Sequence, residues 1–202
     1  MRNPYENSAL LDADSGSMHP GGLRLTSRAA RLAALAPGMK LLDIGCGGGA
    51  TLGYLQEKYG VEPFGIDSSE ELITRARARY PELNLTAGDA KSLPFAGAGF
   101  DAVLSECSFS VIGDYPRLLR ESFRVLKDGA ALIVSDICPK TGLEKMRASF
   151  CGAGFQIRFF EEHMPALVTY ARELERAGID ARRLCGGMRE TTYFLIICEK
   201  SG

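Results

Sequence analysis

The sequence predicts a doubly wound α/β fold, in which helices cover both faces of a mostly parallel sheet. From about residue 39 onward, short apolar runs of β type alternate with amphipathic helical stretches, which is typical of this class. The first of these runs leads directly into a glycine-rich loop, as expected where a strand of such a sheet ends at a ligand crevice. The length of 202 residues is sufficient for one compact domain with a substantial core.

Five strands and the helices between them account for the middle of the chain. The expected strands cover residues 40–45, 63–67, 83–89, 100–107 and 130–136. A helix is expected at residues 68–80, where Ser68 or Ser69 can cap the first turn. Another is expected at residues 115–129, where Gly129 is placed to end it.

The two ends of the chain complete this pattern less regularly. A helix at residues 25–36 precedes the first strand. After the fifth strand we expect a helix at 142–154, a strand at 155–160, a helix at 165–178, an irregular piece at 185–188 and a final strand at 192–200. The long excursion between the last two strands is where variable, substrate-side structure is expected.

Composition and charge exclude several function classes. The chain is 46% hydrophobic and has a formal net charge of −1, so it carries no excess of Lys and Arg to neutralise nucleic-acid phosphates. No apolar run approaches the roughly 18 residues that span a bilayer, and the N-terminus has no basic start followed by an apolar stretch. We therefore expect a cytoplasmic protein without a nucleic-acid or membrane partner.

The six cysteines predict neither a disulfide framework nor a metal site. They are Cys46, Cys107, Cys138, Cys151, Cys185 and Cys198. No two of them form a CxxC pair, and none has a histidine at the spacing of a zinc finger.

The stretch "LLDIGCGGGA", residues 41–50, raises the question of which ligand approaches its glycines. Gly45, Gly47 and Ala50 satisfy the dinucleotide fingerprint GxGxx(G/A), with a helix starting near Ala50. Asp67 ends the second strand, 24 residues after Asp43, where a carboxylate can accept both hydroxyls of a ribose. A dinucleotide and a methyl donor that contains adenosine both predict that acid, so this pattern alone does not separate them.

Asp43 favours the methyl donor. A buried carboxylate directly before the glycine loop works against a pyrophosphate at the following helix, whereas a ligand with an ammonium and a sulfonium group tolerates it. The alternative role for Asp43 is structural, with its carboxylate accepting hydrogen bonds from backbone N–H groups of the loop. The two roles can coexist.

A third motif, "AGDAKSLPFAGAGFDAVLSE", covers residues 87–106. Asp89 is placed to meet an adenine amino group, and Ala90 leaves room for the ring. Residues 36–137 contain four motifs in this order: "LLDIGCGGG", "GIDSSEEL", "GDAKSLPF" and "FDAVLSECSFS" followed by "FRVLKDGAALIVSD". With these motifs the chain resembles the class I S-adenosylmethionine-dependent methyltransferases. The resemblance is in particular to the small-molecule branch that includes the ubiquinone and menaquinone biosynthesis enzymes.

This resemblance implies a Rossmann-like sheet of seven strands with an antiparallel last strand. It also implies S-adenosylmethionine as cofactor and S-adenosylhomocysteine as product. The residues implied to face the methionine and ribose end are Asp43, Gly45, Gly47 and Gly49. Asp67 would hold the ribose hydroxyls, with Ser68 stacked against adenine.

The same resemblance assigns the remaining cofactor contacts. Asp89 and Ala90 would bracket the adenine. Ser105, with Glu106 beside it, would follow the methionine moiety.

The acceptor side carries fewer signals. Methyl transfer is an in-line displacement from a good leaving group, so alignment matters most and a general base is optional. We therefore assign no catalytic residue. Expected substrate contacts are His19 in an N-terminal lid, Cys107 and Ser108 after the fourth strand, and His163 after the sixth.

We expect one methyltransferase domain that acts on a small molecule. Its parts are an N-terminal lid and helix (1–36), a cofactor-binding core (37–137) and a substrate-side part (138–202). The alternatives are an NAD-dependent oxidoreductase, supported by the glycine pattern and Asp67, and a non-catalytic cofactor-binding scaffold of the same fold. A homodimer formed through the C-terminal helices is also considered.

Overall fold

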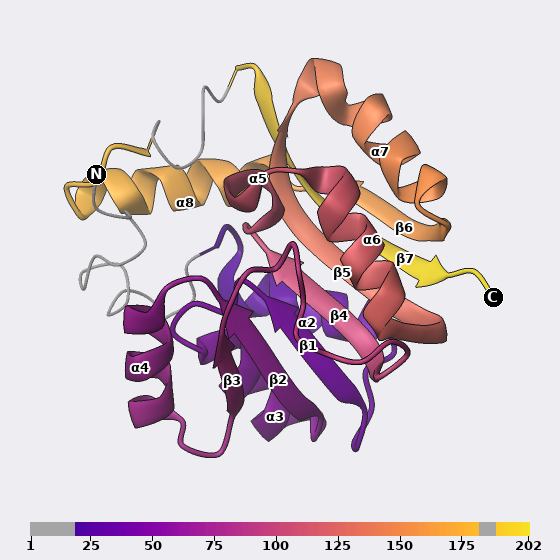
Figure 1. Cartoon of the computed structure of the whole chain (residues 1–202). Helices are drawn as coiled ribbons and strands as arrows, with labels where there is room; N and C mark the ends of the chain where they lie inside the picture. The colour runs from indigo at the N-terminus through magenta and orange to yellow at the C-terminus, as the bar shows by residue number, and fades with distance from the viewer. Residues whose placement is uncertain (1–18, 182–188) are drawn as a thin grey trace.

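The computed structural model describes residues 19–181 and 189–202. One seven-stranded sheet runs through the molecule in the order β3-β2-β1-β4-β5-β7-β6 (Figure 1). The strands are β1 Lys40–Ile44, β2 Glu62–Asp67, β3 Asn84–Ala87, β4 Phe100–Glu106, β5 Leu126–Pro139, β6 Phe155–Glu162 and β7 Thr191–Lys200. Neighbouring strands from β3 to β5 are parallel, and β7 is antiparallel to both β5 and β6. The predicted fold class is confirmed.

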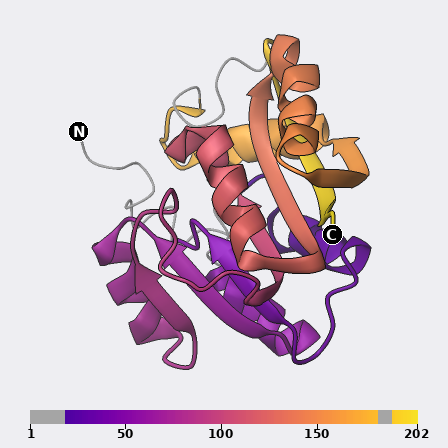
Figure 2. The same ribbon diagram turned by 45° about the vertical axis from the view of Figure 1, so that its right-hand side comes forward.

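Helices cover both faces of the sheet. They are α2 Gly22–Leu32, α3 Ala50–Tyr59, α4 Glu70–Arg79, α5 Phe109–Ile112, α6 Tyr115–Val125, α7 Leu143–Gly152 and α8 Met164–Arg176, with a 3-10 turn η3 at Lys140–Gly142. Apolar side chains of α2, α3, α4 and α8 join one core cluster, and those of α5, α6 and α7 join the other. In both views α6 runs along β5 (Figures 1 and 2).

The alternation of side chains along the strands creates these two cores. Leu41 and Leu42 are both fully buried, but Leu41 lies in the cluster under α2 and α3, and Leu42 lies in the cluster under α6. Successive side chains of a strand point to opposite faces of the sheet, so a strand covered on both faces needs apolar residues at consecutive positions. β1 meets that requirement at Leu41, Leu42 and Ile44, and Asp43 is the one buried polar residue of the strand.

Two helix boundaries show where local signals succeed and fail. The predicted cap of α4 is confirmed, because the Leu72 N–H donates to Ser69 Oγ at 3.2 Å. The prediction that Gly129 ends α6 is wrong. The helix ends at Val125, and the chain turns to extended backbone at Leu126, which pairs with Phe100 of β4 and begins β5.

The other differences lie near the ends of the chain and after β4. α2 begins at Gly22 and ends at Leu32, so it lies three to four residues before the expected helix. The short helix α5 was not expected. The irregular piece expected at 185–188 lies outside the described residues. Within residues 19–181 and 189–202, no helix is both long and apolar enough to cross a membrane.

Candidate active site

A cavity of ≈ 360 Å³ lies at the carboxyl ends of β1, β2, β3 and β4. Strand order reverses between β1 and β4, and this is where a doubly wound sheet forms its ligand crevice. The lining residues are His19, Asp43, Gly45, Cys46, Gly47, Ala50, Thr51, Ile66, Asp67, Ser68, Leu72, Gly88, Asp89, Ala90, Lys91, Glu106, Cys107, Ser108, Val111 and Ile112. Eleven residues that the sequence assigned to cofactor or substrate are therefore brought together: His19, Asp43, Gly45, Gly47, Asp67, Ser68, Asp89, Ala90, Glu106, Cys107 and Ser108.

The glycine loop lines the floor of this cavity, and its backbone has conformations that disfavour residues with a side chain. Gly45 has φ +81°, and a Cβ there would lie 2.1 Å from Ser108 Oγ. Gly49 has φ +78° and precedes the first residue of α3. A Cβ at Gly49 would meet Leu83 at 3.3 Å, so Gly49 faces the packing of α3 and does not line the cavity.

Asp67 holds the loop in place. Its Oδ2 accepts a hydrogen bond from the Gly47 N–H at 2.9 Å, and its Oδ1 accepts one from the Ser69 N–H at 2.9 Å. The Ile66 carbonyl also accepts from the N–H groups of Gly45 and Cys46 at 2.8 and 3.1 Å. The end of β2 thus fixes both the glycine loop and the start of α4, and each Asp67 oxygen retains further acceptor capacity towards the cavity.

The structural role proposed for Asp43 is not observed. No hydrogen bond joins its carboxylate to the loop within the described part of the chain, although Asp43 is only 3% exposed. Burial, together with the negative charges of Glu106 and Asp67, raises the pKa of Asp43 well above its usual value. A cationic group in the cavity would relieve this repulsion.

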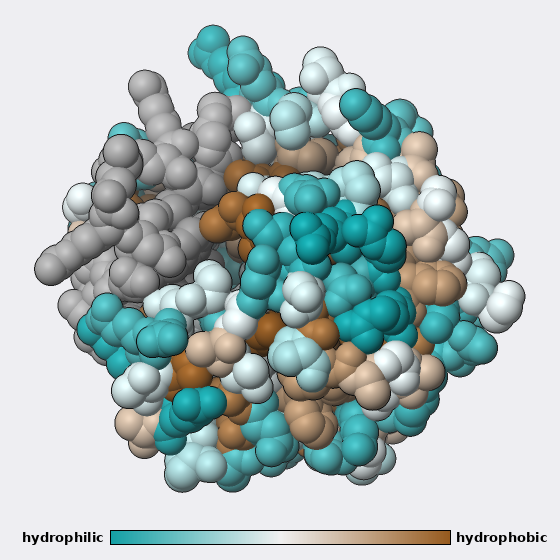
Figure 3. Space-filling view, in the orientation of Figure 1, coloured by the Kyte–Doolittle hydropathy of each residue, from teal (hydrophilic) through white to brown (hydrophobic). Residues whose placement is uncertain are grey.

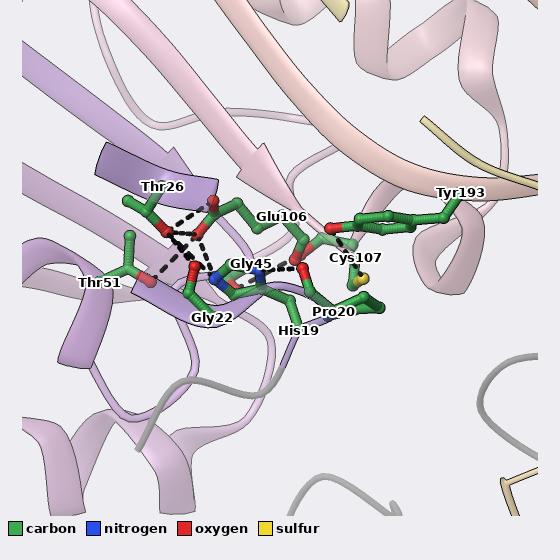
Figure 4. A network of polar contacts seen from close by, with 10 residues as sticks. His19, Pro20, Gly22, Thr26, Gly45, Thr51, Glu106, Cys107 and Tyr193 are labelled. Atoms are coloured by element: carbon green, nitrogen blue, oxygen red, sulfur yellow. Dashed lines mark hydrogen bonds and ion pairs between the residues drawn. The ribbon is translucent and has the colours of Figure 1, made fainter. Parts of the chain in front are cut away.

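Glu106 is the centre of a buried polar network (Figure 4). Its Oε2 lies 2.9 Å from His19 Nε2 and accepts from Thr51 Oγ1 at 3.1 Å, and its Oε1 accepts from Thr26 Oγ1 at 2.9 Å. Thr26 lies on α2 and Thr51 on the first turn of α3, so one carboxylate joins β4 to both helices. Neither threonine was predicted from the sequence. The position of Thr51 directly after the glycine loop was a usable signal, whereas nothing near Thr26 indicated its partner 80 residues away.

The surroundings of His19 favour its charged form. Its Nδ1 lies 3.2 Å from the Pro20 carbonyl oxygen, while Nε2 faces the Glu106 carboxylate. Burial lowers the pKa of His19, but the Glu106 charge and hydrogen bond and the Pro20 carbonyl outweigh it, so the pKa is raised. An imidazolium in this position ties the segment before α2 to the floor of the site.

Apolar side chains contribute to the end of the cavity beside β2, β3 and α4. Ile66, Leu72 and Ala90 line it, and the exposed side chains of Ser68 and Asp89 stand at its rim. Asp89 Oδ1 accepts from the Lys91 N–H at 2.9 Å, which fixes the turn after β3. A flat ring with polar edges fits between these surfaces.

The chain after β4 forms the remaining wall. Cys107 has φ +53°, a left-handed conformation that turns the backbone from β4 into α5, and its Sγ lies 4.0 Å from Tyr193 Oη. Ser108 donates to the Glu106 carbonyl at 3.0 Å. Val111 of α5 lines the cavity and is 59% exposed, and hydrophobic side chains reach the surface at the place of α5 in Figure 3.

Two further predicted contacts lie elsewhere. Ser105 is fully buried within β4, because it points to the face opposite Glu106, and it does not line the cavity. His163 precedes α8 and lines a second cavity between α2 and α8, where its Nε2 lies 3.3 Å from Glu161 Oε2. Among residues 19–181 and 189–202, no group of three or more potential ligands could hold a metal ion.

Comparisons with known proteins identify methyltransferases that are similar in sequence. Residues 42–134 match a family model described as a methyltransferase domain. Phosphoethanolamine N-methyltransferase 1 of Arabidopsis thaliana is 33% identical over 147 residues, which cover 68% of this chain but 30% of that protein. The chain thus spans less than a third of the length of this relative.

Solved structures share the fold over nearly the whole chain. The [4+2]-cyclase SpnF superposes with a TM-score of 0.84 at 22% identity, covering 98% of this chain and 92% of that one. Phosphoethanolamine N-methyltransferase 2 of Haemonchus contortus, in complex with phosphomonomethylethanolamine and S-adenosylhomocysteine, gives 0.80 at 18% identity, covering 96% of this chain and 57% of that one. At these identities the likeness establishes the fold.

Proposed function

We propose that this chain, whose residues 42–134 match the family model of a methyltransferase domain, is of the class I type and transfers the methyl group of S-adenosylmethionine to a small-molecule acceptor. The observation that carries the proposal is the charge of the cavity. Asp43, Asp67, Asp89 and Glu106 line it, and these four acids outnumber its two cationic side chains, Lys91 and the imidazolium of His19. Such a lining favours a ligand with ammonium and sulfonium groups and disfavours the pyrophosphate of a dinucleotide.

Different residues of the cavity contact different parts of the cofactor. Asp67 accepts the ribose hydroxyls while it holds the glycine loop, and Gly45 and Gly47 allow close approach of the methionine moiety. Asp43 supplies a negative charge to that end when the cationic ligand is bound, because the ligand offsets the repulsion that raises the pKa of Asp43. Ser68, Asp89 and Ala90 surround the adenine ring at the end beside β2 and β3, as the resemblance implied.

S-adenosylmethionine supplies an activated methyl group when bound. The protein then has to align the acceptor and keep water out. The network of Glu106 serves this purpose, because one carboxylate binds His19 before α2, Thr26 of α2 and Thr51 of α3. These contacts hold the three parts of the chain together beside the cavity. Since both His19 nitrogens face acceptor atoms, His19 acts by closing the site and not as a base.

The acceptor is expected beside Cys107, Ser108 and α5, which form the cavity wall after β4. Relatives named as phosphoethanolamine N-methyltransferases support a small polar acceptor for this chain. The quinone-biosynthesis branch is a narrower alternative, and a hydroquinone belongs in the same test.

The test is a radiolabel transfer assay with methyl-tritiated S-adenosylmethionine and a panel of small amines, phosphorylated amines and hydroquinones. We expect transfer to at least one acceptor, and a loss of about a hundredfold or more in Asp67→Ala. Asp101→Ala is the matched control, because Asp101 also accepts a backbone N–H, from Lys40 at 2.9 Å, but lies at the opposite end of the sheet. Equal loss in the two variants, or labelled product from neither the wild type nor the control, contradicts the proposal.

A further inference from the structure

A second cavity, of ≈ 1150 Å³, lies between α2, α8 and the carboxyl-terminal half of α3. We call it the α2/α8 groove, and it is defined by Arg24, Arg28 and Arg31 of α2, Lys58 of α3, and Thr169 and Glu173 of α8. His19 lines both this groove and the cofactor cavity. A molecule in the groove therefore reaches the segment that closes the cofactor cavity.

The charge of the groove is strongly positive. Among the residues that the structure describes, Arg24, Arg28, Arg31 and Lys58 face a single lining carboxylate, Glu173. Because the whole chain has a formal net charge of −1, this concentration of cations is a local feature.

Three of these four cations have no acidic partner in the part of the chain that the structure describes. Arg28 forms an ion pair with Glu161. Arg31 Nη1 donates to Ser27 Oγ at 3.0 Å, and Lys58 Nζ donates to Tyr54 Oη at 2.7 Å. Within the described residues, no carboxylate forms an ion pair with Arg24, Arg31 or Lys58.

The arrangement opposes the stability of the isolated fold. Residues 24, 28 and 31 follow the i, i+4, i+7 spacing of one helix face, where like charges repel. The neighbouring phenol responds to the same field. Burial raises the pKa of Tyr54, but hydrogen bonds with Lys58 and Ser27, together with the charges of Lys58 and Arg31, outweigh it and lower that pKa. An anion in the groove would relieve the repulsion.

We propose that the α2/α8 groove binds a phosphate group of the methyl acceptor, so that the substrate class is a phosphorylated small molecule. That the phosphate belongs to the methyl acceptor rests on the proposed function, whereas the binding of an anion in the groove does not depend on it. A phosphate suits the groove because it offers several oxygens and about two negative charges to guanidinium and ammonium donors on two helices. The groove lies between α2 and α8 and adjoins the cofactor cavity, which favours a small ligand over a nucleic acid.

The experiment is a titration of the full-length, ¹⁵N-labelled chain with inorganic pyrophosphate and inorganic phosphate, followed by amide chemical shifts at constant ionic strength. The groove variant is Arg24→Gln/Arg31→Gln/Lys58→Gln. The matched control is Arg79→Gln/Arg120→Gln/Lys145→Gln, which removes the same charges from exposed positions outside both cavities. Each sample is also titrated with S-adenosylhomocysteine.

We expect saturable shifts confined to α2, α8 and the end of α3, with the affinity for pyrophosphate lowered about tenfold or more in the groove variant and unchanged within about twofold in the control. Absence of saturable shifts, or equal loss in both variants, overturns the inference. The inference is also overturned if a single-stranded RNA oligonucleotide displaces pyrophosphate and binds at least about a hundredfold more tightly, because the groove would then belong to another class of ligand. A normal response to S-adenosylhomocysteine with no response to phosphate refutes this inference alone, whereas the reverse refutes the proposed function alone.

Discussion

Replacing Gly45 by alanine tests the geometry of the glycine loop quantitatively. Two costs are expected. The left-handed backbone, φ +81°, costs an alanine about 1–2 kcal/mol, partly offset by the lower entropy of the unfolded chain. The new Cβ would also lie 2.1 Å from Ser108 Oγ and 2.5 Å from Ser108 Cβ, and such overpacking costs about 1–3 kcal/mol.

Gly38→Ala separates these two costs. Gly38 has the same φ of +81°, but nothing lies within 4 Å of a Cβ there. Urea unfolding followed by circular dichroism should therefore show a loss of about 1 kcal/mol for Gly38→Ala and about 2–4 kcal/mol for Gly45→Ala. Adding Ser108→Gly should recover the difference in a double-mutant cycle. Equal losses for Gly38→Ala and Gly45→Ala, or no coupling to Ser108, would refute the reasoning.

Three further predictions concern groups around the site. Burial raises the pKa of Asp136 from 3.8 to about 6, so the native state binds this proton more tightly than the unfolded state, and stability should fall as the pH rises from about 4 to about 6. The free energy of unfolding should change by about 3 kcal/mol over this range, and Asp136→Asn should remove the change; a rise in stability would contradict the prediction. Ser69→Ala should cost about 1 kcal/mol through the lost α4 cap while leaving S-adenosylhomocysteine affinity within about threefold in calorimetry, and no loss of stability would count against the cap. Glu106→Gln should lower the pKa of His19, measured from its ring-proton shifts, because burial remains and the opposing charge is gone; an unchanged value would show that Glu106 does not hold the imidazolium.

The sequence was most informative where function depends on local chemistry. A strand followed by glycines, an acid at the end of β2 and a serine before α4 each act over a few residues, and the structure brings them together at one strand edge. The alternation along β4 also predicts that only one of Ser105 and Glu106 can face the cavity, since adjacent strand residues point to opposite faces. Assigning both to the cofactor overlooked that rule.

Features that depend on long-range pairing could not be derived from the sequence in this way. The end of α6 is set by the pairing of Leu126 with Phe100. The network of Glu106 joins residues from α2, α3 and β4, and the α2/α8 groove joins α2 to a helix more than a hundred residues later. Propensity and spacing describe neighbours along the chain, so contacts of this kind appear only when the sheet is assembled.

Calorimetric titration of the purified chain with S-adenosylmethionine, S-adenosylhomocysteine and NAD⁺ tests the central claim most directly. If the acidic cavity at the ends of β1 to β4 is a methyl-donor site, the first two ligands bind with one-to-one stoichiometry and NAD⁺ gives no heat of binding. Binding of NAD⁺ without the other two would contradict the account, because the same four carboxylates would then have accepted a pyrophosphate.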